Sequence, residues 1–441
     1  MQKRGGDLKL IESIPDASTS DFISVYLDYM QETEPPYIYH RWCAITSIGA
    51  LLGRNCYLRL GHFRVFPNLY TMLIGEPAAR KTTAIKLARR LVAASGYETF
   101  ADDKGAKEKF MANLAGVTEE DLASLGSRRK RAVEDITSES LFGTEGTDKT
   151  PREVFVVADE FSEFSGTGNA EFLTTLGNVW DWDDETVPFK WGFRTSKSLN
   201  IWQPTISILG GNTPEKFART LPLEIIGDGF LSRMILIHGE KSDREYYKPP
   251  VPVEEDTKQI VEFLTSIRSC ATGEFTIDPS ADPFLEKIYK GSRVIEDVRF
   301  KSYNNRRYTQ LLKLCIIHAA ARFSNVVDAE IVLVANTVLT AAEMAMPRAL
   351  GEFGKNRQSD TVNKVMDIIN AARAPVSIKE LWIQVSKDLS KTDELTNILS
   401  NLLLAEKIQK VSGKYLPRRI ANGDKPFVNW DLLTEEERIG L

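Results

Sequence analysis

The sequence predicts an α/β fold built around a three-layer core with a phosphate-binding loop. An apolar run at Leu69–Ile74 is typical of a buried strand, and residues 81–95 carry apolar side chains at helical spacing. Two later apolar runs, Val154–Ala158 and Thr205–Asn212, have the continuous character of strands in a parallel sheet. Helical spacing then dominates from about residue 257. Alternating strands and helices therefore predict the core, and the later helices predict a helical lid.

The loop between the first strand and its helix has the length and chemistry of a nucleotide-phosphate cradle. Its backbone N–H groups and the positive end of the helix dipole are expected to converge on phosphate oxygens of ATP. Lys81 is expected to reach the β- and γ-phosphates, and the Thr82 hydroxyl to hold Mg²⁺. Arg80 stands where glycine normally precedes the lysine, so the backbone there must be one that a side chain tolerates. The alternative is a chance match that binds no nucleotide. The expected phosphate-contacting residues are Gly75, Glu76, Pro77, Ala78, Ala79, Arg80, Lys81, Thr82 and Thr83.

An acidic pair, Asp159 and Glu160, follows the apolar run Val154–Ala158 directly. At the carboxyl end of a parallel strand these two side chains are expected to lie beside the phosphate-binding loop. Asp159 is then the outer-sphere Mg²⁺ partner, and Glu160 the base that orients and polarises an attacking water. The alternative is a solvated acidic pair after a core strand, which the nearby loop motif makes less attractive.

Two further polar residues flank predicted strands. Asn212 ends the run that begins at Thr205, where its amide could orient the water or sense the γ-phosphate. Arg233 precedes the apolar run Met234–His238, so it is expected at the start of a strand, away from its own nucleotide. We expect it to enter a neighbouring subunit's site in a ring and stabilise the transferring phosphoryl group. The alternative is a salt bridge at the sheet edge.

Composition limits the class of protein. The 441 residues suffice for about three domains, and 42% of them are apolar. The formal net charge of −5 argues against a globally basic nucleic-acid coat, so any DNA contact should be local. We see no run of membrane-spanning length and no signal-peptide core at the start, and expect a cytoplasmic protein. The dispersed cysteines predict buried thiols rather than a disulfide frame or a zinc site; they are Cys43, Cys56, Cys270 and Cys315.

Five segments are expected along the chain. Residues 1–64 form an N-terminal helical region, 65–242 the nucleotide-binding core, 257–353 the helical lid, 358–420 a small domain and 421–441 a tail. The small domain should contain three short helices and a hairpin around Ser412-Gly413, which is the pattern of a winged helix. Its basic residues could contact phosphates, although such domains also dock proteins; they are Lys391, Lys407, Lys410, Lys414, Arg418 and Arg419. The basic segment 128–131 could touch nucleic acid, but a solvated helix face is the favoured interpretation.

A predicted hairpin over residues 187–202 combines basic and aromatic side chains. Lys190, Arg194 and Lys197 supply positive charge near its tip. Basic groups with interleaved aromatic rings suit a single-stranded nucleic acid passing through a channel. The alternative is a hairpin that only covers the sheet. The aromatic residues expected to stack are Trp180, Trp182, Trp191 and Trp202.

In this order, the motifs GEPAARKTT, ADE, hairpin, GGN and GFLSR resemble the AAA+ replicative helicases of phages and mobile elements. These are akin to superfamily 3 helicases and to the helicase half of poxvirus-type primase-helicases. The resemblance covers about residues 20–350, and the stretches PPYIYHRW and FPNLYTMLIGEP are especially similar to a phage and prophage group. Arg80 departs from the broader superfamily but not from that group.

The resemblance implies ATP contact by Lys81 and Thr82, catalysis by Asp159 and Glu160, sensing by Asn212 and a trans-acting finger at Arg233. It also implies DNA translocation by the hairpin, in a hexameric ring acting in phage or mobile-element DNA replication. Single-stranded or forked DNA would be the partner, and the winged helix could dock replication proteins. One rival is a helicase loader or nucleoprotein remodeller that uses ATP without unwinding. Another is a DNA-binding regulator whose nucleotide site only switches its assembly.

Overall fold

The computed structural model describes residues 21–103, 105–117, 150–192, 198–221, 229–291, 295–351, 364–370, 372, 375–386, 392–404, 408–411 and 413–417. These residues divide into two compact units, one within 21–351 and the other within 364–417. The larger unit has mixed α/β architecture with parallel strands, as the sequence predicts. The hairpin tip with Arg194 and Lys197, and the basic segment 128–131, lie outside the described residues.

A four-stranded parallel sheet forms the centre of the larger unit, with the strand order β4-β7-β3-β8. Ile74 at the end of β3 pairs in register with Asn212 of β7 and His238 of β8. The carboxyl ends of these strands therefore share one edge of the sheet. The strands are β3 (Tyr70–Ile74), β4 (Glu153–Ala158), β7 (Thr205–Asn212) and β8 (Met234–His238).

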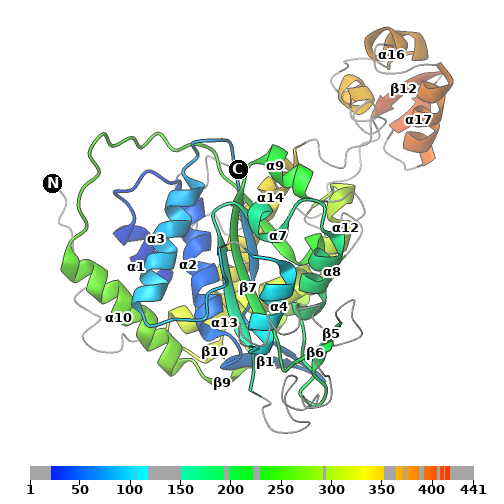
Figure 1. Cartoon of the computed structure of the whole chain (residues 1–441). Helices are drawn as coiled ribbons and strands as arrows, with labels where there is room; N and C mark the ends of the chain where they lie inside the picture. The colour runs from blue at the N-terminus through cyan, green and yellow to red at the C-terminus, as the bar shows by residue number, and fades with distance from the viewer. Residues whose placement is uncertain are drawn as a thin grey trace, which may run out of the picture. The chain divides into compact units, whose positions relative to one another are not determined.

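Helices cover both faces of this sheet (Figure 1). One layer contains α1 (Phe22–Tyr29), α2 (Tyr37–Leu52) and α3 (Lys81–Ala94). Asp21 caps α1, and α2 is buried along almost its whole length because it packs between β7 and the helices α3 and α13. The other layer contains α4 (Lys107–Ala115), α7 (Phe161–Ser165), α8 (Ala170–Val179) and α9 (Pro214–Thr220).

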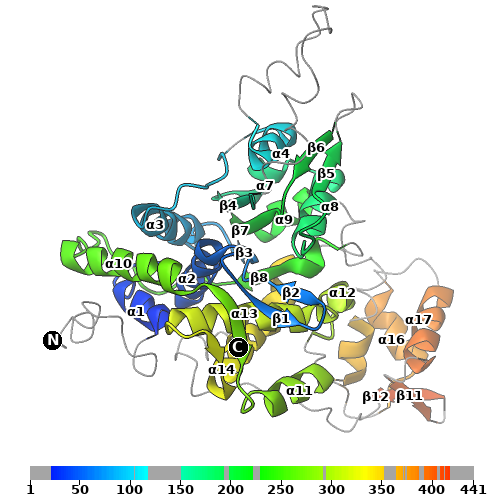
Figure 2. The ribbon, with the colours of Figure 1, turned by 90° about the horizontal axis from the view of Figure 1, so that it is seen from below.

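A second sheet joins parts of the chain that are far apart in the sequence. Its strand order is β10-β9-β1-β2, and β1 pairs parallel with β9 while forming a hairpin with β2. Figure 2 shows β1 and β2 beside α13. The sequence predicted only helices between residues 257 and 353, because strands this short leave little periodicity to read. The strands are β1 (Cys56–Leu60), β2 (Phe63–Val65), β9 (Gly273–Ile277) and β10 (Val326–Val327).

The helices after residue 253 are α10 (Glu254–Cys270), α11 (Asp282–Gly291), α12 (Lys301–Asn304), α13 (Arg307–Ala321) and α14 (Ala329–Leu350). Short 3₁₀ turns lie at Leu231–Arg233 and Val298–Phe300. Contrary to our expectation, one helix, α14, is long and apolar enough to cross a membrane by length and composition. In the fold, 72% of the apolar 18-residue stretch of α14 is buried, and the helix packs against neighbours such as α13 and β8, which is compatible with a soluble protein.

The cysteines are free thiols, and three of the four match the expectation of burial. Cys43, Cys56 and Cys315 lie in the core, whereas Cys270 is exposed at the end of α10. The prediction for Cys270 was wrong because the apolar stripe of α10 consists of residues such as Ile260, Phe263 and Ile267, and the last turn leaves the core.

The hairpin predicted within residues 187–202 is confirmed in its two strands, β5 (Phe189–Gly192) and β6 (Ser198–Ile201). Lys190 pairs with Asn200 and its side chain is exposed. Two of the four tryptophans expected to stack on nucleic acid are instead buried, namely Trp180 beneath Lys313 and Trp191 in the hairpin. Their rings contribute to packing, so that part of the prediction was wrong.

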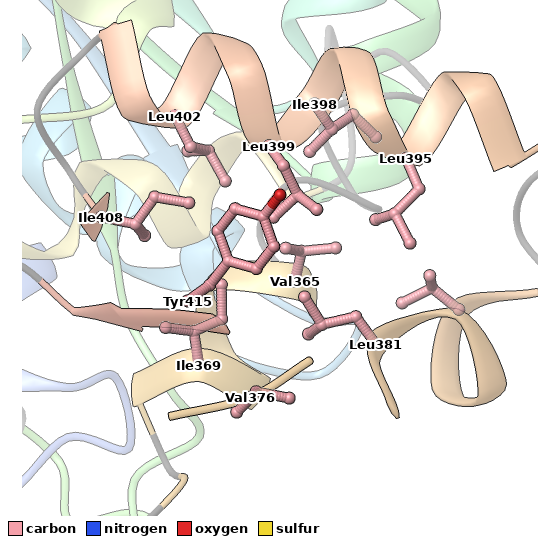
Figure 3. Close-up of a cluster of buried hydrophobic side chains, with 11 residues drawn as sticks. Val365, Ile369, Val376, Leu381, Leu395, Ile398, Leu399, Leu402, Ile408 and Tyr415 are labelled. Atoms are coloured by element: carbon pink, nitrogen blue, oxygen red, sulfur yellow. The ribbon is translucent and has the colours of Figure 1, made fainter. Parts of the chain in front are cut away.

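The smaller unit consists of helical residues 364–370, α16 (Ile378–Val385), α17 (Thr392–Leu404) and the hairpin β11 (Ile408–Val411) and β12 (Lys414–Pro417). Ser377 begins α16 with a reciprocal cap in which Glu380 also takes part. Aliphatic side chains from the helices gather around Tyr415 of β12 (Figure 3). A bridge between Val376 and Tyr415 ties the hairpin to the segment before α16.

Candidate functional site

The loop predicted to bind phosphate lies between the end of β3 and the start of α3. Ala78 and Arg80 adopt left-handed backbone conformations, with φ of 70° and 60°. Arg80 also occupies the N-cap position of α3, and no side chain caps that helix. The first turn of α3 therefore presents backbone N–H groups that no capping side chain satisfies, as an anion site at a helix N-terminus requires.

Lys81 folds back over this loop. Its ammonium group donates to the carbonyl oxygens of Gly75 at 2.7 Å and Glu76 at 2.9 Å. Burial lowers the pKa of Lys81, and the charge of Glu76 partly opposes that shift. Thr82, the next residue, is exposed in the first turn of α3. A cation on the loop and a free hydroxyl beside it are the groups that a Mg²⁺–nucleotide needs.

Tyr39 of α2 holds the beginning of the loop in place. Its hydroxyl lies 3.0 Å from the carbonyl oxygen of Ile74 and 2.8 Å from that of Gly239, so it contacts the residues that end β3 and follow β8. Burial raises the pKa of this phenol far above its usual range, so the hydroxyl remains a donor. Through Tyr39, α2 thereby holds the start of the loop against the end of β8.

The acidic pair lies at the carboxyl end of β4, and each carboxylate has a lysine partner. Lys86 of α3 lies 2.9 Å from Asp159, and Lys216 of α9 forms an ion pair with Glu160. Asp159 also approaches the neighbouring strand closely, because a Cβ on Gly211 would lie 2.8 Å from its carbonyl oxygen. Both carboxylates therefore stand at the same edge of the sheet as the loop.

Asn212 is the residue of β7 nearest to the loop. The N–H of Gly75 donates to its carbonyl oxygen at 3.4 Å, and its side-chain oxygen accepts from the N–H of Thr213 at 3.1 Å. Its side-chain amide nitrogen is buried without a hydrogen-bond partner. A buried amide without a partner costs free energy unless a ligand or water satisfies it, which suits a group that senses a bound ligand.

Arg233 lies at the opposite edge of the sheet. It precedes Met234, which pairs with Tyr70 at the start of β3, so the five-residue strand separates it from the loop by about 16 Å. Its guanidinium donates to the carbonyl oxygen of Gly229 at 2.6 Å and lies 3.7 Å from Asp181. Arg306, which is more exposed, lies 3.0 Å from the same carboxylate. The salt bridge considered for Arg233 is therefore present, and its predicted action on a neighbouring subunit stays a prediction.

Lys190 belongs to a different region from the loop. The hairpin leads into the start of β7, where the carbonyl oxygen of Trp202 accepts from the N–H of Arg152 at 3.1 Å. The hairpin thus lies at the amino edge of the sheet, where β7 begins, and Figure 1 shows β5 and β6 away from α3. The proposed roles in nucleotide chemistry and DNA contact fall on opposite edges.

These residues fit a Mg²⁺–ATP complex. The uncapped start of α3 offers N–H donors, Lys81 offers a cation, and the unpartnered amide of Asn212 offers a further donor. Within the described residues, no group of three or more His, Cys, Asp or Glu side chains forms a metal site. Thr82 and Asp159 alone would suit Mg²⁺, which usually keeps several waters and takes other oxygens from substrate phosphates.

Sequence reasoning missed four residues that shape this site, namely Glu34, Tyr39, Lys86 and Lys216. Lys86 lies five residues beyond Lys81 and Lys216 four residues beyond Asn212, both at exposed helix positions, which is a weak signal for a pair with Asp159 or Glu160. Glu34 forms an ion pair with Arg80, and Tyr39 donates to Ile74; both partners are distant in the sequence, so spacing along the chain says nothing of these contacts.

A scan against protein-family models finds no match for this chain, and no curated protein matches it either.

Proposed function

We propose that this protein is an ATP-driven DNA helicase or translocase that works as a hexameric ring in phage or mobile-element DNA replication. One observation carries the proposal: the loop with Lys81, the acidic pair and Asn212 meet at the carboxyl edge of a single parallel sheet. Ligands of open parallel sheets bind at that edge. The proposed cofactors are ATP and Mg²⁺, and the proposed location is the cytoplasm of a bacterium or phage-infected cell.

Each residue at this edge has a proposed role. Lys81 would leave its carbonyl partners and neutralise the β- and γ-phosphate oxygens, while Thr82 and Asp159 would hold Mg²⁺. Glu160 would orient a water and accept its proton, and Asn212 would donate its free amide to the γ-phosphate or the water. When bound, Mg²⁺–ATP supplies the phosphoryl group whose transfer to water releases the free energy used for movement.

The remaining parts of the chain fit the same proposal. The larger unit would be an AAA+-type core with a helical lid, and the smaller unit, with its helices and antiparallel hairpin, would be a winged helix. The β5–β6 hairpin would contact single-stranded or forked DNA through Lys190, Arg194 and Lys197. The winged helix would contact DNA or dock replication proteins. Lys410 and Lys414 are exposed on its hairpin.

The test compares ATP hydrolysis and fork unwinding by wild type, Lys81→Ala and Glu160→Gln. Wild type should do both, Lys81→Ala should do neither, and Glu160→Gln should bind ATP but turn it over slowly. ATP turnover without unwinding would point to a loader or remodelling ATPase, and ATP binding without turnover to a switched regulator. Wild-type turnover by either variant would reject the assignment of the site.

A further inference from the structure

Arg80 has a backbone conformation that its side chain disfavours. Its φ of 60° and ψ of 22° lie in the left-handed region, which glycine adopts freely and other residues rarely adopt. Its carbonyl oxygen accepts from the N–H of Ala84 at 3.2 Å, so Arg80 also starts the hydrogen bonding of α3. The direction of the N–H groups that follow it, on Lys81 and Thr82, depends on this conformation.

The Arg80 side chain points to Glu34, in the turn between α1 and α2. The guanidinium Nε lies 2.6 Å from Glu34 Oε2, and the Arg80 and Glu34 side chains are 49% and 18% exposed. The second carboxylate oxygen of Glu34 accepts from the backbone N–H of Tyr246 at 3.1 Å. Glu34 therefore binds the phosphate loop and the segment after β8 at the same time.

The turn that carries Glu34 is itself held in place. Arg244 donates to the carbonyl oxygen of Pro35, and its guanidinium lies 4.2 Å from the centre of the Tyr37 ring. The Glu34 carboxylate can hold Arg80 in one geometry, because the segment after β8 fixes the turn that carries Glu34, independently of the phosphate loop.

From these contacts we infer that Glu34 is a positioning residue: its ion pair with Arg80 holds the phosphate loop in the left-handed conformation that glycine would otherwise supply. The inference rests on the proposed function of the loop in nucleotide binding. Without the pair, Arg80 would relax to a common conformation and rotate the N–H groups of Lys81 and Thr82 away from the phosphates. A change at Glu34 would then act through the backbone of Arg80.

The experiment measures ADP binding with Mg²⁺ by calorimetry, so that turnover plays no part. Arg80→Gly and Arg80→Ala remove the same charge and the same ion pair, but only glycine adopts a positive φ without strain. We therefore expect Arg80→Gly to bind ADP about tenfold tighter than Arg80→Ala, the ratio that the left-handed penalty implies. Equal affinities of these two variants would overturn the inference.

A double-mutant cycle gives the second arm. Glu34→Ala should weaken ADP binding by up to about fivefold in the wild-type background, the limit for a partly exposed ion pair, and by much less in the Arg80→Gly background, where no strained side chain remains to be held. Glu34→Gln, which keeps an acceptor for Tyr246, should fall between wild type and Glu34→Ala. If Glu34 acted only as a charge near the phosphates, its removal would tighten binding by the same factor in both backgrounds, and the inference would be wrong.

Urea denaturation without nucleotide tests separately whether the left-handed backbone at position 80 is strained by a side chain. Arg80→Gly should unfold at a higher urea concentration than Arg80→Ala, and the reverse order would contradict the inference even if ADP binds. Failure of the wild-type protein to bind ADP would overturn the proposed function and this inference together, whereas equal affinities of the glycine and alanine variants would overturn this inference alone.

Discussion

Lys216 of α9 forms an ion pair with Glu160, the carboxylate proposed to take a proton from the attacking water. The lysine lies four residues beyond Asn212, so the turn after β7 brings the side chains of Asn212 and Lys216 to the carboxyl edge of the sheet. The Lys216 and Glu160 side chains are 56% and 31% exposed, so the pair can open. While it is closed, the ammonium competes with water for the carboxylate.

Replacing Lys216 should therefore raise basal hydrolysis. An exposed ion pair contributes at most about 1 kcal/mol, so Lys216→Met should raise kcat for ATP by up to about fivefold. Steady-state hydrolysis without DNA measures this effect. Arg219→Met is the matched control, because it removes a cation from the same helix whose partner is Glu215 rather than Glu160. A loss of turnover in Lys216→Met would instead make the lysine a required part of the site.

The central sheet could be predicted from the sequence because its strands are continuous apolar runs. Two strands, Thr205–Asn212 and Met234–His238, have the predicted bounds. The common location of Asp159, Glu160 and Asn212 follows because the strands before them end at one edge of the sheet. The second sheet could not be predicted, because β9 and β10 are short, β9 pairs with β1 far away in the sequence, and β10 pairs only with β9. Periodicity describes one segment and carries no information on such pairings.

The finer features of the site escaped prediction for a related reason. The sequence shows that Arg80 replaces a glycine, yet the structure retains the left-handed conformation, and the partner Glu34 comes from a turn 46 positions earlier. Trp180 and Trp191 look like exposed stacking rings by composition, but the fold buries both. Burial depends on neighbours that only the tertiary structure brings together.

A second prediction concerns Arg233 and its partner Asp181. For Arg233 to act on a neighbouring subunit, its contacts with Gly229 and Asp181 must open. Arg233→Ala and Lys81→Ala proteins should each be inactive, but a mixture should regain ATP hydrolysis, because mixed interfaces contain one intact loop and one intact arginine. Hydrolysis by mixtures at varied ratios measures this recovery.

Arg306→Ala is the matched variant for this experiment, because Arg306 binds the same carboxylate and is more exposed than Arg233. Recovery with Arg306→Ala but not with Arg233→Ala would move the trans-acting role to Arg306. Normal hydrolysis by Arg233→Ala alone, in proportion to protein concentration, would remove the argument for a finger at this position.

A third prediction concerns pH and the buried Lys313. Its ammonium donates to the carbonyl oxygen of Phe66 at 2.8 Å and to Asn68 Oδ1 at 2.6 Å, and it lies 4.2 Å from the Trp180 ring centre. Burial lowers the pKa of Lys313 from 10.5 to about 7. Between these two values the unfolded chain holds a proton that the folded chain has released, so stability should rise with pH in that window.

The comparison is between wild type and Lys313→Met in urea unfolding at several pH values. The unfolding free energy of wild type should rise relative to that of the variant by up to about 1.4 kcal/mol per pH unit above pH 7. Below pH 7 both states are protonated, and the difference should be constant. Lys287→Met changes an exposed position and keeps Lys313, so the difference between its unfolding free energy and that of wild type should not depend on pH. Parallel curves for Lys313→Met would mean that the two acceptors and the indole keep the ammonium charged.

The last prediction separates DNA contact from ATP use. Lys190 lies on the hairpin at the amino edge of the sheet, and Arg194 and Lys197 belong to the same hairpin sequence, so their triple alanine variant should retain basal ATP hydrolysis. It should lose stimulation by DNA and unwinding, because these cations would no longer neutralise phosphates. Each lost contact removes about 0.7 from the slope of log affinity against log salt for a single strand, so three contacts remove about 2. Fluorescence titrations of single-stranded DNA at several salt concentrations measure that slope.

The control is a second triple alanine variant with the same loss of charge, at Lys258, Lys287 and Lys290 on α10 and α11. If both triple variants keep the wild-type slope and unwinding, the hairpin only covers the sheet, and the DNA contact must lie in the smaller unit or the basic segment 128–131.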